Sequence, residues 1–349
     1  MNAILTAIFY FLIMVVVFGV LIFIHEFGHF ITARLCSVTI KEFAIGMGPK
    51  LFSKKSKKYD TVYTLRALPI GGFVSMEGED ESSEDANAFC NKKIWQRMLI
   101  VAAGPILNLV LGFILITVLL VPQKALPSTV IYQFNENAIS NQFLMENDKI
   151  LEVDGTKVHT GYELAYEIMN QGYEPIDVVV ERNGEKITLS DVIFPTIEDE
   201  ASGVLFGDYD FKIFGEKKTF FNLAKHAYFR SLSTIKMVYD SLGGLFSGRF
   251  GLDAVSGPVG VTEAVGTAAK SGYENFIHII AVLTINLGVF NLIPFPALDG
   301  GRFLFLLIEG IRRKPINRNI EGYINFVGIM ILFGFMIFIT CKDILKLIF

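Results

Sequence analysis

Cysteine is scarce in this sequence, and charged residues are thinly spread. The 349 residues include only three cysteines, Cys36, Cys90 and Cys341, whose wide spacing argues against a disulfide framework and against a cysteine zinc site. Charged side chains make up 19% of the chain, and the formal net charge is −4. No run of Lys or Arg is long enough to form a nucleic-acid surface, so nucleic acid is not an expected partner.

Hydrophobic residues, in contrast, make up 52% of the chain. A helical run of roughly 20 apolar residues crosses a hydrocarbon core of about 30 Å. Four runs qualify: Ile4 to Ile24, Met98 to Val121, Phe276 to Pro294 and Ile324 to Thr340. A cleaved signal peptide is the alternative for the first run, but this run lacks a basic start and a small-residue cleavage site. The sequence therefore predicts a polytopic α-helical membrane protein with four transmembrane helices.

Basic residues predict how the chain crosses the membrane, because Lys and Arg of short loops stay on the cytoplasmic side. They gather in two loops, one after the first run and one after the third: Arg34, Lys41, Lys50, Lys54, Lys55, Lys57, Lys58, Arg66, Lys92, Lys93 and Arg97, then Arg302, Arg312, Arg313, Lys314 and Arg318. Both loops are expected in the cytoplasm. Both termini and the segment from about Pro122 to Asn275 are expected outside.

Three smaller elements are predicted between the membrane runs. Residues Thr61 to Met76 are rich in β-branched and aromatic residues around Gly71-Gly72, which predicts a β-hairpin associated with the membrane. Residues 128–196 predict an external α+β domain, with strands around Asp154-Gly155, a helix at Glu163 to Met169 and a hairpin that turns at Asn183-Gly184. Residues 220–246 predict an amphipathic helix, which either lies on the membrane or packs on the external domain.

The strongest chemical signal lies at the end of the first membrane run. His25-Glu-Phe-Gly-His29 has the pattern H-E-x-x-H, in which two histidines one helical turn apart share a face and can bind one Zn²⁺. The intervening Glu26 is then placed to act as the general base of a metalloprotease. Ionisable groups inside a membrane helix are costly and are functional sites by default.

A zinc hydrolase usually has three protein ligands, so one ligand remains to be found. The candidate is Asp299, which follows the third run in Asn291-Leu-Ile-Pro-Phe-Pro-Ala-Leu-Asp-Gly-Gly301. The first and third runs are expected to cross the membrane in the same direction. Asp299 and the two histidines should therefore lie near the same, cytoplasmic end, and the metal ligands are predicted to be His25, His29 and Asp299.

These two motifs together resemble the site-2 protease family of intramembrane zinc metalloproteases, in particular its bacterial regulator-of-sigma-factor branch. Further similar stretches cover nearly the whole chain: Phe43-Ala-Ile-Gly-Met-Gly-Pro, Leu68-Pro-Ile-Gly-Gly-Phe-Val, Ala103-Gly-Pro-Ile-Leu-Asn108 and Ser256-Gly-Pro-Val-Gly. The resemblance implies a multi-pass protein of the bacterial cytoplasmic membrane. It also implies that the external α+β unit is a single PDZ domain.

The resemblance further implies regulated intramembrane proteolysis. The expected substrates are single-span membrane proteins, such as anti-sigma factors or signal-peptide remnants, that another protease has already cut outside the membrane. It implies that Asn291 helps to hold the substrate or the active site. The hairpin is expected to bind an extended substrate along an exposed strand edge, through residues Gly72, Phe73, Val74 and Ser75.

Several residues depart from the family pattern or fall outside the motifs. Glu146-Asn-Asp148 stands where a Gly-Asp turn is usual, and Arg302 follows Asp-Gly-Gly where His is frequent. Asn108 and Asn286 lie inside membrane runs, where hydrogen bonds between helices are the simplest role for them. The histidines outside the motif, His159, His226 and His278, are expected to be ordinary structural or surface residues.

The expected organisation follows the chain in order: a first transmembrane helix with the zinc motif (1–34), a cytoplasmic loop with the hairpin (35–97), a second transmembrane helix (98–121), the PDZ-like domain (128–196), an amphipathic linker (197–275), a third transmembrane helix with Asp299 (276–301), and a loop with the fourth helix (302–349). Two other classes of function remain as alternatives. A metal transporter would explain the ligands but not Glu26, and internal repeats typical of transporters are absent. A PDZ-bearing scaffold with an inactive site would not need an intact motif.

Overall fold

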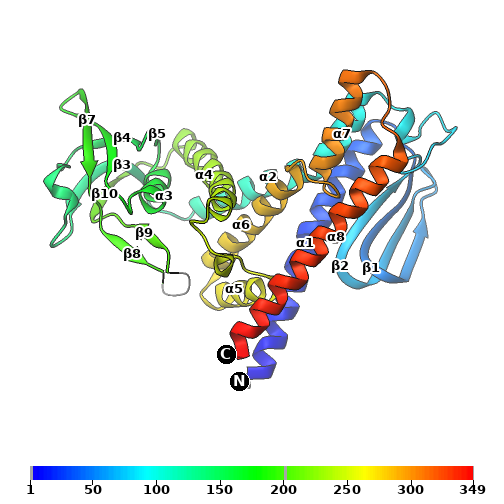
Figure 1. The fold of residues 1–349 in the computed structure, drawn as a ribbon, viewed down its shortest axis with the longest axis horizontal. Helices are drawn as coiled ribbons and strands as arrows, with labels where there is room; N and C mark the ends of the chain where they lie inside the picture. Colours follow the sequence, from blue (N-terminus) through cyan, green and yellow to red (C-terminus); the bar gives the residue numbers. More distant parts are fainter. Residues whose placement is uncertain (1–2, 200–202, 349) are drawn as a thin grey trace. The chain divides into compact units, whose positions relative to one another are not determined.

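The computed structural model describes residues 3–199 and 203–348, and the chain forms two compact units (Figure 1). One unit consists of residues 1–112 and 256–349, and the other of residues 113–255. Residues 1, 2 and 349, at the ends of the first and last predicted segments, and residues 200–202 of the predicted linker lie outside the described residues.

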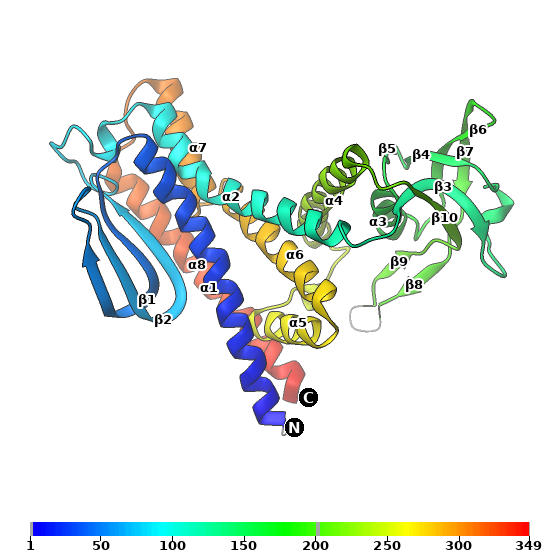
Figure 2. The same ribbon diagram turned by 180° about the vertical axis from the view of Figure 1, so that it is seen from behind.

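Three of the four predicted transmembrane helices lie wholly in the first unit, and the second of the four begins there and ends within residues 113–255. Helices α1 (Ala3–Leu35), α2 (Ile94–Leu120), α6 (Tyr273–Leu292) and α8 (Arg318–Ile348) are each long and apolar enough to cross a membrane. The prediction of four such helices is therefore confirmed. Two shorter helices, α5 (Pro258–Lys270) and α7 (Asp299–Arg312), also belong to this unit. Helix α5 packs against both α1 and α6 (Figure 2).

The third transmembrane helix ends earlier than the sequence predicts. Helix α6 ends at Leu292, and Ile293 is extended (φ −63°, ψ 135°), as expected for a residue that precedes a proline. After the turn that contains Pro294 and Pro296, the chain begins α7 at Asp299. Asp299 is thus the first residue of a separate helix and does not lie at the end of the apolar one.

Two long strands, β1 (Ile40–Lys55) and β2 (Val62–Met76), form an antiparallel sheet beside α1 (Figure 1). The sequence predicts a hairpin within residues 61–76, but the pairing is different. Residues 72–76 of β2 pair with residues 40–45 of β1, whereas residues 62–65 pair with residues 52–55 and also with 42–45. Both arms of the predicted hairpin therefore pair with β1, which the sequence analysis did not assign as a strand.

The second unit is an α+β domain built on one antiparallel sheet of short strands. The sheet has the order β10-β3-β4-β6-β7, and β5 pairs with β4. Its elements are β3 (Leu126–Phe134), β4 (Lys149–Val153), β5 (Thr156–Lys157), α3 (Gly161–Gln171), β6 (Ile176–Arg182), β7 (Glu185–Val192) and β10 (Phe211–Glu216), and a separate two-stranded sheet is formed by β8 (Thr196–Glu198) and β9 (Leu205–Gly207). Leu164 and Ile168 of α3 pack on the sheet in a buried apolar core.

The local predictions for this unit agree with its structure. Strands β4 and β5 flank Asp154-Gly155, and β6 and β7 form a hairpin whose turn residues Asn183 and Gly184 have φ values of 54° and 83°. Positive φ at both central residues is typical of a type I′ turn. The sheet extends beyond the predicted domain end at residue 196, however, because β10 adds to the edge of β3.

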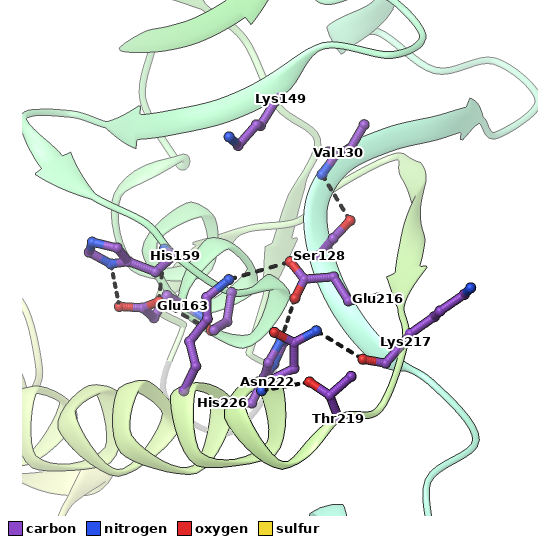
Figure 3. Close-up of polar contacts among 12 residues, drawn as sticks. Ser128, Val130, Lys149, His159, Glu163, Glu216, Lys217, Thr219, Asn222 and His226 are labelled. Carbon is purple, nitrogen blue, oxygen red and sulfur yellow. Dashed lines mark hydrogen bonds and ion pairs between the residues drawn. The ribbon is translucent and has the colours of Figure 1, made fainter.

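The amphipathic helix is α4 (Phe220–Ser247), and it packs on α3 within this unit. At one end His159 stacks on Phe229, with ring centroids 4.0 Å apart. Further along, Lys236 of α4 forms an ion pair with Glu167 of α3 at 3.0 Å. Figure 3 shows the polar contacts near the start of α4, where Glu216 of β10 faces His226. Of the two predicted positions for this helix, packing on the α+β domain is the one that the contacts support.

Candidate metal centre and active site

Three potential ligand atoms from two distant parts of the chain meet beside α1. His25 and His29 lie one turn apart on this helix, and their Nε2 atoms are 3.2 Å apart. Oδ2 of Asp299, at the start of α7, lies 3.0 Å from Nε2 of His25 and 3.3 Å from Nε2 of His29. The two histidines are only 8% and 9% exposed. The structure therefore brings together the three predicted ligands in a largely buried group.

The other ring nitrogens show which way each histidine points. Nδ1 of His29 lies 2.8 Å from the backbone carbonyl oxygen of Ile100, which can only accept a hydrogen bond. The proton of a neutral His29 ring therefore sits on Nδ1, and the Nε2 lone pair faces Asp299 and His25. Nδ1 of His25 lies 3.2 Å from the side-chain amide of Asn108.

The amide of Asn108 can hold His25 in the same tautomer. With Nδ2 facing His25, the buried Oδ1 of Asn108 has no hydrogen-bond partner among the described residues. Reversing the amide places Oδ1 opposite Nδ1–H of His25, so that the oxygen gains a donor. The hydrogen-bond partners of an amide determine which of its two orientations is correct. Both histidines then present Nε2 lone pairs to one point, and the carbonyl of Ile100 and the amide of Asn108 orient them from behind.

The separations within this group fit a zinc ion. Zn²⁺ bonds to His nitrogen and carboxylate oxygen are about 2.0–2.2 Å, so two ligands of a tetrahedral ion lie about 3.3 Å apart. The observed separations are 3.0, 3.2 and 3.3 Å. Two lone pairs and a carboxylate that face one point repel one another unless a cation lies between them, so the donor set fits a bound metal.

Two glycines allow the helices to approach each other at this group. A Cβ atom on Gly104 of α2 would lie 2.3 Å from Nε2 of His29 and 2.9 Å from Nε2 of His25. A Cβ atom on Gly28 of α1 would lie 2.4 Å from the backbone oxygen of Ala103. Any larger residue at either position would push α2 away from the ligands. Both glycines lie within sequence motifs, but the motifs alone do not specify this close approach.

Glu26 lies between the ligand group and strand β2. The backbone N–H of Val74 faces its carboxylate, and a Cβ atom on Gly72 would lie 3.4 Å from its Cγ. The N–H of Val74 thus points away from β1. Among the described residues, the stretch 72–76 pairs with β1 alone, so its other side is a strand edge that faces the predicted base.

Of the remaining predicted site residues, Phe73 and Ser75 belong to this strand, whereas Asn291 lies in α6. Phe73 and Ser75 pair with Ala44 and Glu42 of β1, in the same strand as Gly72 and Val74. Asn291 donates a hydrogen bond to the carbonyl of Leu287 in its own helix, at 3.0 Å. No hydrogen bond among the described residues joins it to the three ligands.

The loop between α6 and α7 is held by a residue that the sequence analysis did not single out. Asn325 of α8 accepts a hydrogen bond from the backbone N–H of Ala297 at 3.2 Å. Ala297 has φ 76°, a conformation that is strained for a residue with a side chain. A Cβ atom on Gly328, one turn further along α8, would lie 2.7 Å from Pro296. Helix α8 therefore supports the turn that leads to Asp299.

Comparison with known proteins assigns the chain to a family. The model of peptidase family M50 matches residues 13–335, a span that includes His25, Glu26, His29 and Asp299. The chain belongs to this family. As an M50 peptidase it is a zinc metalloprotease, and its four apolar helices make it a membrane protein. The alternatives of a metal transporter and of an inactive scaffold are thereby set aside.

Relatives of this M50 peptidase match it over nearly its full length. A protein of Fusobacterium nucleatum subsp. nucleatum, provisionally named a zinc metalloprotease, is 36% identical over 348 residues, which cover 97% of this chain and 99% of the relative. The regulator of sigma-W protease RasP of Bacillus subtilis is 30% identical, with 95% of this chain and 97% of the relative covered. The zinc metalloprotease RasP of Shouchella clausii is 31% identical, with 95% and 98% covered.

Proposed function

We propose that this peptidase cleaves transmembrane segments of single-span membrane proteins inside the membrane, using a zinc ion held by His25, His29 and Asp299. The observation that carries the proposal is the convergence of these three ligands beside Glu26 and a free strand edge, with both histidines on a helix long enough to cross a membrane. The likeness to the sigma-W protease supports a role in regulated intramembrane proteolysis, with anti-sigma factors or signal-peptide remnants as the class of substrate.

Each residue of the site has a separate role in the proposed reaction. A bound zinc ion supplies Lewis-acid polarisation of the scissile carbonyl and activates a water molecule. Glu26 takes a proton from the attacking water and later transfers it to the leaving amine. Ile100 and Asn108 keep the two histidines in the orientation that a metal requires. Gly28 and Gly104 let α1 and α2 pack so closely that no side chain enters this space.

The strand edge of β2 is the proposed binding site for the substrate backbone. A transmembrane helix uses its own amides in internal hydrogen bonds, so the segment to be cut must first unwind. The edge formed by residues 72–75 can then replace the lost bonds, because an extended chain adds to it as a further strand. The N–H of Val74 faces Glu26, so an entering strand that accepts a hydrogen bond from this donor lies directly beside the carboxylate that transfers the proton.

The unit formed by residues 113–255 is the proposed substrate filter. Its two histidines with described contacts, His159 and His226, each face a glutamate, and neither forms part of the cluster of metal ligands found among the described residues. A PDZ-like domain on the outside would admit membrane stubs that a first protease has already trimmed. The distribution of basic residues supports an active site near the cytoplasmic face, with this unit and both termini on the external side.

Cleavage kinetics of the purified enzyme with zinc test the proposal. We expect substrates with glycine near the cut to be cleaved faster than substrates with a run of leucine there, because helix opening limits the rate. Val74→Pro removes the outward N–H and should depress turnover without releasing zinc, whereas Val74→Ala keeps the N–H and serves as the control. If cleavage ignores both helix propensity and the proline, while folding and zinc content are normal, substrate unwinding by strand addition is wrong.

A further inference from the structure

Arg302 connects the helix that carries Asp299 to the end of strand β2. It lies one turn after Asp299 on α7. Its Nη1 atom is 2.5 Å from Oε1 of Glu79, and its Nη2 atom is 2.7 Å from Oδ1 of Asp80 and 3.2 Å from the backbone oxygen of Glu79. All of these partners belong to the segment that directly follows β2, and the guanidinium also lies 5.7 Å from the ring centre of Phe89.

Glu79 continues this connection into the strand itself. Its second carboxylate oxygen, Oε2, accepts a hydrogen bond from the backbone N–H of Met76 at 3.2 Å. Successive outward-facing amides of an edge strand lie two residues apart, and the N–H of Val74, two residues before Met76, faces Glu26. The carboxylate of Glu79 therefore bonds to Arg302 with one oxygen and, with the other, to the amide of Met76, which directly follows the proposed substrate edge.

The start of α7 is fixed on its other side by close backbone packing. A Cβ atom on Gly300 would lie 2.2 Å from the carbonyl oxygen of Ile293, and one on Gly301 would lie 2.3 Å from that of Phe295. The turn before α7 thus seats the helix against α6. The polar contacts of Arg302 then determine how the same helix is placed with respect to β2.

From these contacts we infer that Arg302 and Glu79 are positioning residues, which hold the metal ligand Asp299 and the strand edge of β2 in the one arrangement that presents the scissile carbonyl to the metal centre. The inference rests on the proposed function. Neither residue touches the reacting atoms. Their effect arises because the substrate is held by β2 while one metal ligand is held by α7, and a displacement of about 1 Å between such groups costs roughly a hundredfold in rate.

The chain offers a matched control in a second pair on the same helix. Arg97 of α2 bonds to Glu309 of α7 through two contacts, at 2.5 and 3.3 Å. Glu309 is as exposed as Glu79, at 17%, while Arg97 is more buried than Arg302, at 12% against 27%. This pair also fixes α7, but it lies ten residues beyond Asp299 and has no described contact with β2. Loss of Arg97 should therefore reproduce the general structural cost of an unpaired glutamate without changing the placement of the substrate.

The test compares Arg302→Ala, Arg302→Lys, Glu79→Gln and Arg97→Ala in the full-length, zinc-loaded enzyme. Cleavage of a single-span model substrate gives kcat and KM, mass spectrometry of the products gives the bond that is cut, and zinc content and thermal melting are measured in parallel. We expect Arg302→Ala to lower kcat by roughly tenfold to a hundredfold, with less change in KM, and to cut at neighbouring bonds as well. Arg302→Lys keeps the charge and should restore much of the rate, and Glu79→Gln should cut less precisely than the wild type.

The outcomes separate this inference from the proposed function. If the wild type cuts and Arg302→Ala cuts the same bond at the rate of Arg97→Ala, the positioning role is wrong and the protease assignment stands. If Arg302→Ala loses zinc or shows no cooperative thermal unfolding, the test rests on the bond that Arg302→Lys and Glu79→Gln cut. An unchanged cut position in both variants contradicts the inference. A zinc-loaded, folded wild type that cuts no membrane segment overturns the proposed function and this inference together.

Discussion

The two units use histidine in opposite ways. In the unit of residues 113–255, His159 faces Glu163 and His226 faces Glu216, both at 3.4 Å, so each ring has a carboxylate of its own. In the unit of residues 1–112 and 256–349, His25 and His29 share one carboxylate, and Nδ1 of each ring already has a protein partner. In the first arrangement each histidine–carboxylate pair balances one donor against one acceptor, although Nδ1 of His226 has no hydrogen-bond partner among the described residues. The second leaves three acceptors facing one point.

This difference shows which polar cluster indicates a metal. A ring N–H beside a carboxylate has a complementary partner, because the nitrogen donates and the carboxylate accepts. Three converging acceptors are unfavourable in a buried place unless a cation joins them. Burial alone does not make the distinction, since His226 is fully buried and belongs to the balanced group.

The largest effects are expected from substitutions that remove one of the three converging acceptors. His25→Ala, His29→Ala and Asp299→Ala each remove one ligand, so each should lose most of the zinc and the cleavage of substrate. Glu26→Gln should keep the zinc and slow cleavage by roughly 10²–10⁴-fold, because only the general base is lost. Metal analysis and cleavage kinetics of the four purified variants give both quantities, and a chelator followed by added zinc should abolish and restore cleavage of the wild type.

A histidine of the balanced group provides the control for these variants. His159→Ala removes an imidazole beside a carboxylate from the other unit and should change neither zinc content nor the rate at the metal centre. Zinc lost equally from Glu26→Gln, or retained by Asp299→Ala, would contradict the roles assigned to these residues.

A smaller effect is expected when the group behind a ligand is removed. Asn108 is fully buried on α2 and is the described partner of Nδ1 of His25. Asn108→Leu keeps most of the volume but leaves the ring without an acceptor for its proton. Loss of such a partner typically lowers metal affinity roughly 10–100-fold. Zinc affinity, measured by competition with a chelator, is the direct readout.

The neighbouring Thr284 supplies a matched control for Asn108. Its hydroxyl donates to the backbone oxygen of Asn108 at 3.1 Å, so Thr284→Val removes a buried hydrogen bond at the same place and leaves the Asn108 side chain intact. We expect Thr284→Val to keep the zinc affinity of the wild type. Equal losses in the two variants would show that packing between α2 and α6, and not the orientation of His25, is what Asn108 provides.

The sequence predicts the parts of this site that depend on local spacing. His25, Glu26 and His29 are placed by one helical turn, so their geometry follows from the helix alone. The turn at Asn183-Gly184 is predicted for the same reason, because two residues set its backbone conformation. The four apolar helices follow from length and composition.

Parts that depend on contacts between distant segments were missed. The partner of residues 72–76 is the stretch 40–45, about 30 residues earlier, and nothing in the local pattern of either segment specifies that pairing. Asn108 resembles any polar residue in a membrane helix until His25 is seen beside it. Gly104 could have been suspected from the small residues around it, since such residues let membrane helices approach closely.

The smallest expected effect is a pH dependence of stability in the unit of residues 113–255. It comes from His226, one of the two histidines that face a glutamate. Burial lowers the pKa of His226 below its ordinary value, although the facing carboxylate of Glu216 opposes this shift, as does the more distant Glu163, while the charge of Lys225 adds to it. The folded unit therefore favours the neutral ring. Its contribution to stability is fully present above the unfolded-state pKa of about 6.5 and is lost as the pH falls through the folded-state pKa.

Hydrogen exchange in α3 and α4 of the full-length protein, corrected for the intrinsic effect of pH, measures this loss. We expect protection in these helices to fall as the pH is lowered below about 6.5, and His226→Phe to remove most of that dependence because the ring can no longer be protonated. His159→Phe keeps the stack on Phe229 and should leave the dependence as it is. The two variants thus separate a fully buried histidine from a half-exposed one that faces a carboxylate at the same distance. If both variants respond to pH as the wild type does, the neutral state of His226 is not what stabilises the packing of α4 on α3.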